Sequence, residues 1–505
     1  MKDTIIKNDG TSKTMKGSAS IPETYEDFRQ ALIAGEINVD ISLNEDGCDV
    51  VGTPLNKNSL LKSATAEKFG LDGEDATVNE VLEMLSIPQL YITSLDGSVM
   101  AVTKGGVSYE GVKVGNEYRF NLIDFGTYTV TATLEGISKT MNINIDTVKR
   151  YAIEFGCKTV FGISRDITSS STSWTRTEDA VGKTFSASIG TTRGHSDFDN
   201  EVIYKDIVNR TNVGSDVFTK IPKFYYKRTR VMNIEEIQIT DKPWQGFKIH
   251  PAFLRAGVEK DYIYVGSYKT SSNNKSVSGA SPQVNQTRAT MRNNARNKGA
   301  GYGIIDIATW NAIQMLMLVE VADNNVQAVI GEGWSASGHS GSKATGSCDA
   351  VPNLTGRPAG TSNDVDVVWR GIEGFWGNVW EWVDGININN GAYYICTDPT
   401  KYADDTTTNY TSLEYTGGTG WNTSYIQQEG YDEEIDWCMM PTTAGGGSAT
   451  TYYADACWSA SGWRVCLHGG RWSIGSICGL FTVDFYSDSS FTAAYFGSRL
   501  LYIPS

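Results

Sequence analysis

The chain has 505 residues and a formal net charge of -15, with many Gly, Tyr and Trp residues. At roughly 150 residues per domain, this length predicts about two to four domains. The acidic balance argues against nucleic-acid and anionic-membrane partners, because those are bound through basic patches. No apolar run reaches the ~18 residues that span a bilayer, so we expect no membrane insertion.

Neither the first residues nor the cysteines indicate a classical secreted protein. The start, MKDTIIKNDGTSKTMKG, has no apolar segment of the kind found in cleaved signal peptides. The eight Cys residues are scattered without a CxxC pair. This spacing favours free thiols in a reducing compartment over a disulfide framework or a zinc ribbon. Export without a cleaved signal stays open.

Residues 1–88 predict a small α/β adaptor. Phe28, Leu32 and Ile33 fall at helical spacing, and a second helix is expected to end at Gly70. A third, short helix is expected over 77–85, before Pro88. These few elements can form only a small core. We therefore expect this segment to oligomerise or to attach to a partner. An independent mini-domain without a special role is the alternative.

Residues 89–148 predict a compact β-sandwich. The clearest strand is 126–134, where Tyr128, Val130, Ala132 and Leu134 alternate with threonines. Glycine-containing turns divide the remainder into short strands. The pattern resembles the immunoglobulin-like spacer modules of surface and phage proteins. A spacer role is therefore expected, with carbohydrate binding as the alternative.

Residues 149–505 show no convincing linker and are expected to form one large domain. The Ser-, Thr- and Asp-rich stretch 163–200 predicts surface loops, and strand-like runs occur at 217–226, 246–253 and 262–266. One long helix is expected over 309–321, with an apolar stripe facing the core. The stripe consists of Trp310, Ile313, Leu316, Met317 and Val321. The acidic, Tyr- and Gly-rich segment 385–462 has no regular period and predicts long loops.

The final stretch, about 469–499, combines two sets of residues. The first set suits a rigid frame: Gly469, Gly470, Trp472, Gly475, Gly479, Phe481, Phe485, Gly497 and Arg499. The second set shares no common chemistry and predicts a display surface that binds a ligand: Arg471, Ser473, Ile474, Ser476, Ile477, Thr482, Asp484, Tyr486, Asp488, Phe491 and Tyr495. Strand alternation over 481–486 would turn Phe481 and Phe485 to the core and Thr482, Asp484 and Tyr486 outward.

Five residue types are missing from the end of the chain. From Ser473 to Ser505 there is no Lys, Glu, Gln, Met or Trp. These five are encoded only by codons that end in a purine. Randomised adenines in AAC-like codons would produce this absence, because such codons keep a pyrimidine at the third position. A short, weakly charged tail that lacks these residues by chance is the alternative explanation.

The run Gly377-Asn378-Val379-Trp380-Glu381-Trp382 resembles the formylglycine-generating-enzyme branch of the C-type lectin fold. The runs Gly462-Trp463-Arg464-Val465, Gly469-Gly470-Arg471-Trp472 and Gly497-Ser498-Arg499 fit the same branch. Within it, a frame with unrelated residues between its members is most similar to the variable proteins of diversity-generating retroelements, which include phage tropism determinants. The resemblance covers roughly 150–505 and is most specific in the last third.

The resemblance implies an α+β C-type lectin-like domain that binds a host cell-surface protein or glycan through a diversified face, often as a homotrimer. Residues 1–88, with Gly52-Thr53-Pro54-Leu55-Asn56, are similar to the virion-attachment end of phage tail fibres, which implies contacts with other tail or baseplate proteins. We therefore expect a phage receptor-binding protein located in the virion. A bacterial surface lectin or adhesin of the same fold is the alternative.

Enzymatic and metal sites fit the residues less well. The formylglycine-forming oxidase needs two close thiolates for Cu(I), but Thr482 and Val483 stand where a partner for Cys478 is needed. None of the four His residues lies in a nucleophile motif, so a structural role is expected for each, with His468 on the display surface as the alternative. Asp384, Asp398, Asp404 and Asp405 lack EF-hand spacing, which favours a solvated acidic loop over a Ca2+ site. We expect no catalytic residues, metal or cofactor.

Overall fold

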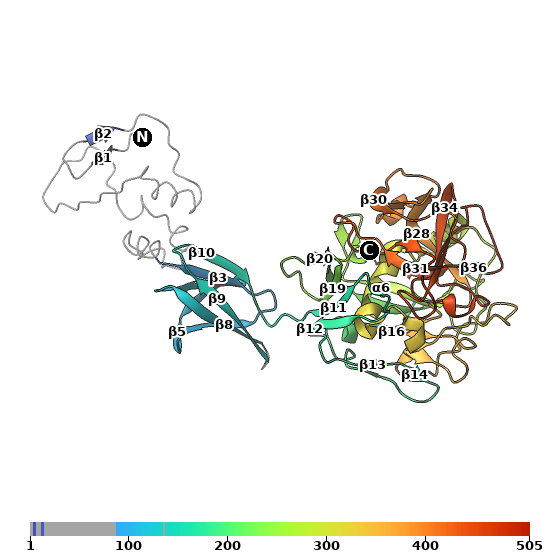
Figure 1. Ribbon diagram of the computed structural model, residues 1–505, viewed down its shortest axis with the longest axis horizontal. Helices are drawn as coiled ribbons and strands as arrows, with labels where there is room; N and C mark the ends of the chain where they lie inside the picture. Colours follow the sequence, from blue (N-terminus) through green and yellow to red (C-terminus); the bar gives the residue numbers. More distant parts are fainter. Residues whose placement is uncertain (1–3, 7–11, 15–86, 135–136, 505) are drawn as a thin grey trace. The chain divides into compact units, whose positions relative to one another are not determined.

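The computed structural model describes residues 4–6, 12–14, 87–134 and 137–504 (Figure 1). The chain divides into two compact units, Met1–Ser86 and Ile87–Ser505. In the first unit, β1 (Thr4–Ile6) pairs antiparallel with β2 (Ser12–Thr14). The helices predicted for the adaptor lie outside the described residues.

Two four-stranded sheets form a β-sandwich near the start of the second unit. One sheet has the order β10-β3-β7-β6 and the other β5-β4-β8-β9. Their strands are β3 (Gln89–Thr93), β4 (Val99–Lys104), β5 (Val107–Tyr109), β6 (Gly111–Val114), β7 (Glu117–Asn121), β8 (Gly126–Leu134), β9 (Ile137–Ile145) and β10 (Arg150–Glu154). Leu90, Phe120 and Tyr128 from both sheets share one core.

The strand predicted over 126–134 is confirmed as β8, with Tyr128, Val130 and Ala132 buried. The predicted end of the sandwich at 148 needs correction, because β10 pairs in parallel along the whole of β3. The sandwich therefore continues to Glu154. Its assignment as an immunoglobulin-like module stays a prediction.

The rest of the described chain is mostly β, with three larger sheets. The first five-stranded sheet has the order β12-β11-β19-β18-β20. It consists of β11 (Phe161–Asp166), β12 (Thr175–Glu178), β18 (Tyr225–Val231), β19 (Ile234–Thr240) and β20 (Lys248–Ile249). The second, β16-β17-β23-β37-β24, consists of β16 (Val208–Val213), β17 (Asp216–Pro222), β23 (Tyr262–Lys269), β24 (Tyr302–Ile304) and β37 (Arg499–Tyr502).

The strand-like runs of the sequence correspond to these sheets only in part. The run predicted at 217–226 is divided between β17 and β18, which belong to different sheets. Lys223 and Phe224 separate the two strands. The stretch 163–200, expected to be loops, contributes β12 and part of β11. The run at 262–266 is confirmed inside β23.

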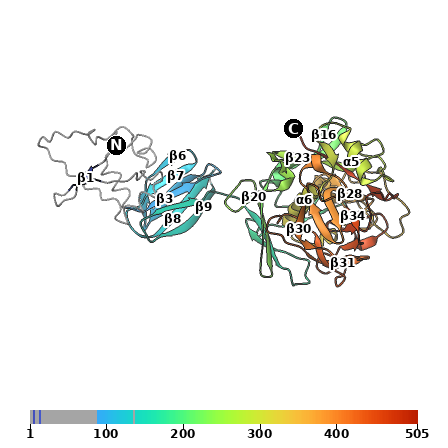
Figure 2. The same ribbon diagram turned by 90° about the horizontal axis from the view of Figure 1, so that it is seen from above.

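The third sheet has nine strands and carries the end of the chain. Its strands are β28 (Trp380–Asn389), β29 (Ala392–Ile395), β30 (Thr411–Thr416), β31 (Ser424–Glu429), β32 (Pro441–Ala444), β33 (Ala456–Ser459), β34 (Trp463–His468), β35 (Val483–Phe485) and β36 (Phe496–Gly497). β28 and β34 run side by side (Figure 2). The prediction of long loops over 385–462 holds in part: strands β28 to β33 cross the segment, with long connections at 396–410, 430–440 and 445–455. Bulges interrupt the alternation of these strands.

Smaller elements complete the fold. They are β13 (Phe185–Ser186), β14 (Ser188–Ile189), β15 (His195–Ser196), β21 (Leu254–Arg255), β22 (Val258–Glu259), β25 (Gly356–Arg357), β26 (Val368–Trp369), β27 (Ile372–Glu373), α5 (Arg288–Arg296), α7 (Val326–Ile330) and the 3-10 turns η1 (Tyr204–Asp206), η2 (Pro251–Phe253), η3 (Pro352–Leu354), η4 (Pro399–Lys401) and η5 (Gly475–Ile477).

The long helix α6 (Ile307–Val321) lies in the main core (Figure 1). It packs against β11 and β19 of the first five-stranded sheet and against β28 of the nine-stranded sheet. The helix is confirmed, and the predicted apolar stripe lies in the core, although burial extends to every residue from Ile307 to Glu320. Asp306 caps it by accepting the N–H of Thr309 at 2.8 Å. A helix between two sheets needs apolar residues on all faces.

Side chains of helix α5 donate hydrogen bonds to backbone carbonyls at a bulge in β28. The register of β28 against β34 shifts between Val383 and Asn387. The buried Arg288 guanidinium donates to the carbonyls of Val383 at 3.0 Å and Ile386 at 2.6 Å. One turn later, Arg292 pairs with Asp384. These bonds hold β28 in the register that the C-terminal segment requires.

Candidate ligand-binding face

The predicted frame of the final segment is buried almost throughout. Trp472, Phe481, Phe485 and Arg499 are all at most 8% exposed. Among the frame glycines, Gly475 alone is half-buried. Gly470 has φ +77°, and a Cβ there would lie 2.4 Å from the Cys478 sulfur. The position therefore needs glycine both for its backbone and for its close packing.

A buried charge cluster fixes the two ends of the segment. Arg499 Nε and Nη2 donate to the Glu381 carboxylate at 3.0 and 2.7 Å, and Lys269 Nζ donates at 2.7 Å. His468 Nε2 lies 3.3 Å from the same carboxylate. Burial opposes ionisation, but Arg499 and Lys269 hold the pKa of Glu381 well below its usual range. His468 is fully buried, which agrees with the structural role expected for it and excludes it from the display surface.

Backbone hydrogen bonds tie the segment to the rest of the domain. The N–H of Trp472 donates to the Asn378 carbonyl at 3.0 Å, and the N–H of Gly475 donates to Ser335 at 2.8 Å. The N–H of Trp380 donates to the carbonyl of Tyr495 at 2.9 Å. These contacts hold a mostly non-regular segment in place without constraining the exposed side chains.

Ten of the eleven predicted binding residues are at least partly accessible. Tyr486 is 62% and Phe491 44% exposed. The others are half-buried, apart from the exposed Ser476: Arg471, Ser473, Ile474, Ile477, Asp484, Asp488 and Tyr495. The Arg471 guanidinium lies 4.2 Å from the centre of the Tyr495 ring. The segment thus presents aromatic, aliphatic and charged groups together.

Thr482 does not belong to this surface. It is fully buried, and its hydroxyl donates to the Ile477 carbonyl at 2.6 Å and accepts the N–H of Gly479 at 2.8 Å. The outward orientation predicted by alternation was wrong, because β35 begins only at Val483. Thr482 instead closes the turn that precedes the strand.

Asp484 is half-buried beside two arginines. Its Oδ1 accepts the N–H of Tyr486 at 2.6 Å. Burial raises the pKa of Asp484 to about 6, and the backbone bonds of Tyr486 and Ser487 and the charges of Arg464 and Arg471 limit the rise. The carboxylate is therefore mostly ionised at neutral pH.

Residues outside the final segment also border it, and sequence reasoning missed them. His339 Nδ1 lies 3.1 Å from the Trp472 carbonyl oxygen, and its ring stacks on Trp334. Trp458 of β33 is the strand partner of Asp484. Trp334 and His339 lie in a Gly- and Ser-rich stretch without periodicity. Their proximity to the segment depends on the fold, so no sequence signal could have found them.

The acidic loop residues considered for Ca2+ are held by cations and backbone instead. Arg292 Nη2 lies 2.7 Å from both Asp384 and Asp404. Asp398 accepts the N–H of Thr400 at 2.9 Å and caps η4. Asp384 is buried, so the expected solvated loop needs correction at that position. No group of three or more His, Cys, Asp or Glu that could hold a metal ion occurs among the described residues.

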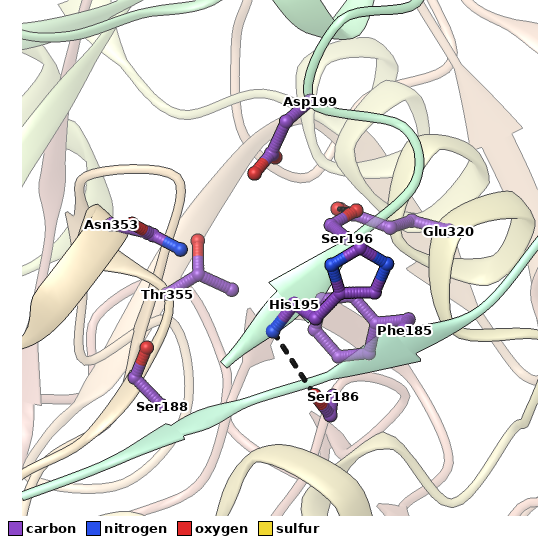
Figure 3. Close-up of a pocket in the computed structure, with 9 residues that line it drawn as sticks. All are labelled: Phe185, Ser186, Ser188, His195, Ser196, Asp199, Glu320, Asn353 and Thr355. Carbon is purple, nitrogen blue, oxygen red and sulfur yellow. Dashed lines mark hydrogen bonds between the residues drawn. The ribbon is translucent and has the colours of Figure 1, made fainter. Parts of the chain in front are cut away.

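A small polar pocket lies near β13 and β15 (Figure 3). It is lined by Phe185, Ser186, Ser188, His195, Ser196, Asp199, Glu320, Asn353 and Thr355. The Ser186 hydroxyl accepts the backbone N–H of His195 at 3.0 Å, as the dashed line shows. The imidazole Nε2 lies 2.7 Å from Asp197, outside the lining set. These bonds do not form the serine–imidazole contact that an activated nucleophile requires.

The seven described cysteines are free thiols. Cys478 is buried, and its Sγ donates to the Gly469 carbonyl at 2.9 Å. Burial raises the pKa of Cys478 and of Cys466 above the usual range for thiols. Both groups are therefore held in the protonated form.

Comparison with known proteins gives structural neighbours only. No protein-family model and no curated protein matches the chain. Among solved structures, the M1 and P3c variants of Major Tropism Determinant each align at 12% identity and a TM-score of 0.21, over 80% of this chain and 83% of theirs. At this TM-score the likeness carries no conclusion on function. No helix in the described part of the chain is long and apolar enough to cross a membrane.

Proposed function

We propose that the chain is a receptor-binding protein of a phage particle, which binds a host cell-surface ligand through the face formed by 471–495. The observation that carries the proposal is the separation of two residue sets within one short segment. The frame residues other than Gly475 are buried, and Arg499 is ion-paired with Glu381, whereas Tyr486 is 62% and Phe491 44% exposed. A face of aromatic anchors with small polar residues between them resembles an antibody paratope in its physics.

The absence of five residue types after Trp472 supports diversification of this face. Accessible positions on a fixed frame tolerate replacement, because surface substitutions change stability by about 0.5 kcal/mol or less. Buried Thr482 is an exception to this argument, since its hydroxyl closes a turn. We infer that it varies only among residues that keep that bond.

A binding role is favoured over the oxidase that the sequence motifs suggest. A Cu(I) site needs thiolates. Thr482 and Val483 stand where a second thiol is needed beside Cys478. Trimeric assembly, attachment through residues 1–88 and location in the virion are parts of the same proposal. Several weakly binding copies on one particle would raise avidity.

A library of the full chain tests the proposal. Codons 486, 488 and 491 are randomised in one library and codons 472, 481 and 485 in a matched one. We expect most members of the first library to fold, and different members to bind different strains of a bacterial panel. We expect few members of the second library to fold. Equal folding losses in both libraries, or identical strain binding by all members of the first, would refute the proposal.

A further inference from the structure

Trp458 and Asp484 lie side by side on one face of the nine-stranded sheet. β33 pairs in parallel with β35, and these two residues are Cα partners. Partners in register point their side chains to the same face, with strands about 5 Å apart. Leu467 is the partner of Asp484 on the other side, and it packs in the same apolar cluster as Trp458.

The Trp458 ring is held in one orientation. Its Nε1 donates to Thr423 Oγ1 at 3.1 Å, and its ring meets Trp380 edge to face at a centroid distance of 5.6 Å. The side chain is half-buried. The indole is thus fixed from two sides and retains an accessible part.

The Asp484 carboxylate lacks an ion-pair partner within 4.0 Å among the described residues, although two arginines are near. Arg464 Nη2 donates to the Ser461 carbonyl at 2.6 Å, and Arg471 lies over the Tyr495 ring. The backbone N–H of Tyr486 donates a hydrogen bond to Asp484 Oδ1. Tyr486, two residues after Asp484, is 62% exposed.

We propose that Trp458 and Asp484 together bind a cationic side chain, the ammonium of a lysine or the guanidinium of an arginine, on a protein ligand. A carboxylate attracts a cation by charge and an indole face attracts it by its quadrupole. Trp458 precedes the segment 469–499, so it would serve every variant of the face, whereas Asp484 would set the preference of this one. The inference rests on the proposed function and names the ligand class for the same face.

NMR of the full chain tests this pair. The 13 tryptophans are labelled with 15N at the indole, and Trp458→Phe assigns the Trp458 signal. The probes are Nα-acetyl-lysine methylamide and the uncharged, similarly shaped Nα-acetyl-norleucine methylamide. We expect the Trp458 signal to move with the lysine compound alone. Asp484→Asn should weaken the apparent affinity by about tenfold, since one charge contact is lost, and Asp261→Asn, at an exposed carboxylate outside the face 471–495, should leave it unchanged.

Absence of a shift with the lysine compound, or equal shifts with both probes, would overturn the inference. A shift with a neutral methyl glycoside but not with the lysine compound would also overturn it and would indicate a glycan site. A different result would refute the proposed function alone. In that result the Trp458 signal responds to the lysine compound, but substitutions in 471–495 leave cell binding unchanged.

Discussion

Arg499 and Glu381 form a fully buried, two-contact ion pair that joins β37 to β28, with N···O distances of 3.0 and 2.7 Å. The same guanidinium donates to the carbonyls of Gly266 at 2.7 Å and Glu373 at 2.8 Å. One side chain therefore holds the end of the display segment against three separate parts of the domain. Under the proposed diversification, this pair would keep the conformation of the segment while its exposed residues vary.

Replacement of Glu381 by alanine should strongly destabilise the domain. Lys269 and Arg499 would then be buried without their counter-charge, which costs about 3–5 kcal/mol. Urea unfolding of the full chain measures the loss. The control is Glu414→Ala, because Glu414 is exposed. A loss for Glu381→Ala that matches this control would contradict the assigned role of the ion pair.

Two phenylalanines of the final segment should respond in opposite ways. Phe485 is 1% exposed and packs edge to face on Tyr393 at 5.6 Å, so Phe485→Ala should cost about 3–5 kcal/mol. Phe491 is 44% exposed, and Phe491→Ala should cost less than about 1 kcal/mol. Thermal and urea unfolding check both values. Similar losses for the two variants would show that the division into frame and face is wrong.

Gly479 should not tolerate a side chain. A Cβ at this position would lie 2.2 Å from Asp455 Oδ1 and 2.5 Å from Gln327 Oε1. Asp455 accepts the N–H of Phe481 at 2.7 Å, so its displacement would break a buried bond. We expect Gly479→Ala to cost about 1–3 kcal/mol. Gly338→Ala, where a Cβ meets nothing within 4 Å, is the matched control and should be neutral.

Glu429 should make stability fall as pH rises. It is 2% exposed, and its Oε2 has no hydrogen-bond partner among the described residues. Burial raises the pKa of Glu429 to about 8, although Arg228 and Arg165 oppose the rise. The folded state therefore binds a proton that the unfolded state releases near its ordinary pKa of about 4.3.

The contribution of Glu429 to stability is fully present below the unfolded pKa and is lost as pH rises through about 8. The slope is at most about 1.4 kcal/mol per pH unit. Unfolding of wild type and Glu429→Gln between pH 5 and 9 should show a smaller decline for the variant. Parallel curves would mean that Glu429 is not protonated in the folded protein.

The division of the final segment into buried and exposed residues could be predicted from the sequence only in part. Alternation correctly identified Phe481 and Phe485 as core residues. Phe485 lies in β35, and Phe481 lies just before this strand begins. Alternation failed at Thr482, since this side chain closes the turn that precedes the strand by accepting the N–H of Gly479. It failed again over 385–462, where bulges break the period and β28 and β31 also pair with more distant strands. Local patterns carry no information on such pairing.

The charge network at Glu381 was also beyond sequence reasoning. Lys269, Glu381 and Arg499 are far apart in the chain and meet only because β23, β28 and β37 converge. The position of Trp458 beside the display face also depends on the fold, through the parallel pairing of β33 with β35. The frame residues could be predicted from the sequence. Glycine allows close backbone packing because it has no side chain, and tryptophan is usually buried because its side chain is large and apolar.

The binding of labelled full-length protein to a bacterial strain panel tests the central claim most directly. The double variant Tyr486→Ala, Phe491→Ala is compared with Phe125→Ala, which removes an aromatic ring that is 52% exposed in the sandwich. We predict that the double variant keeps wild-type unfolding behaviour and loses at least about tenfold in affinity for the strains bound, as truncated anchor residues do. The Phe125→Ala variant should bind as wild type. Undiminished binding by the folded double variant would contradict the account.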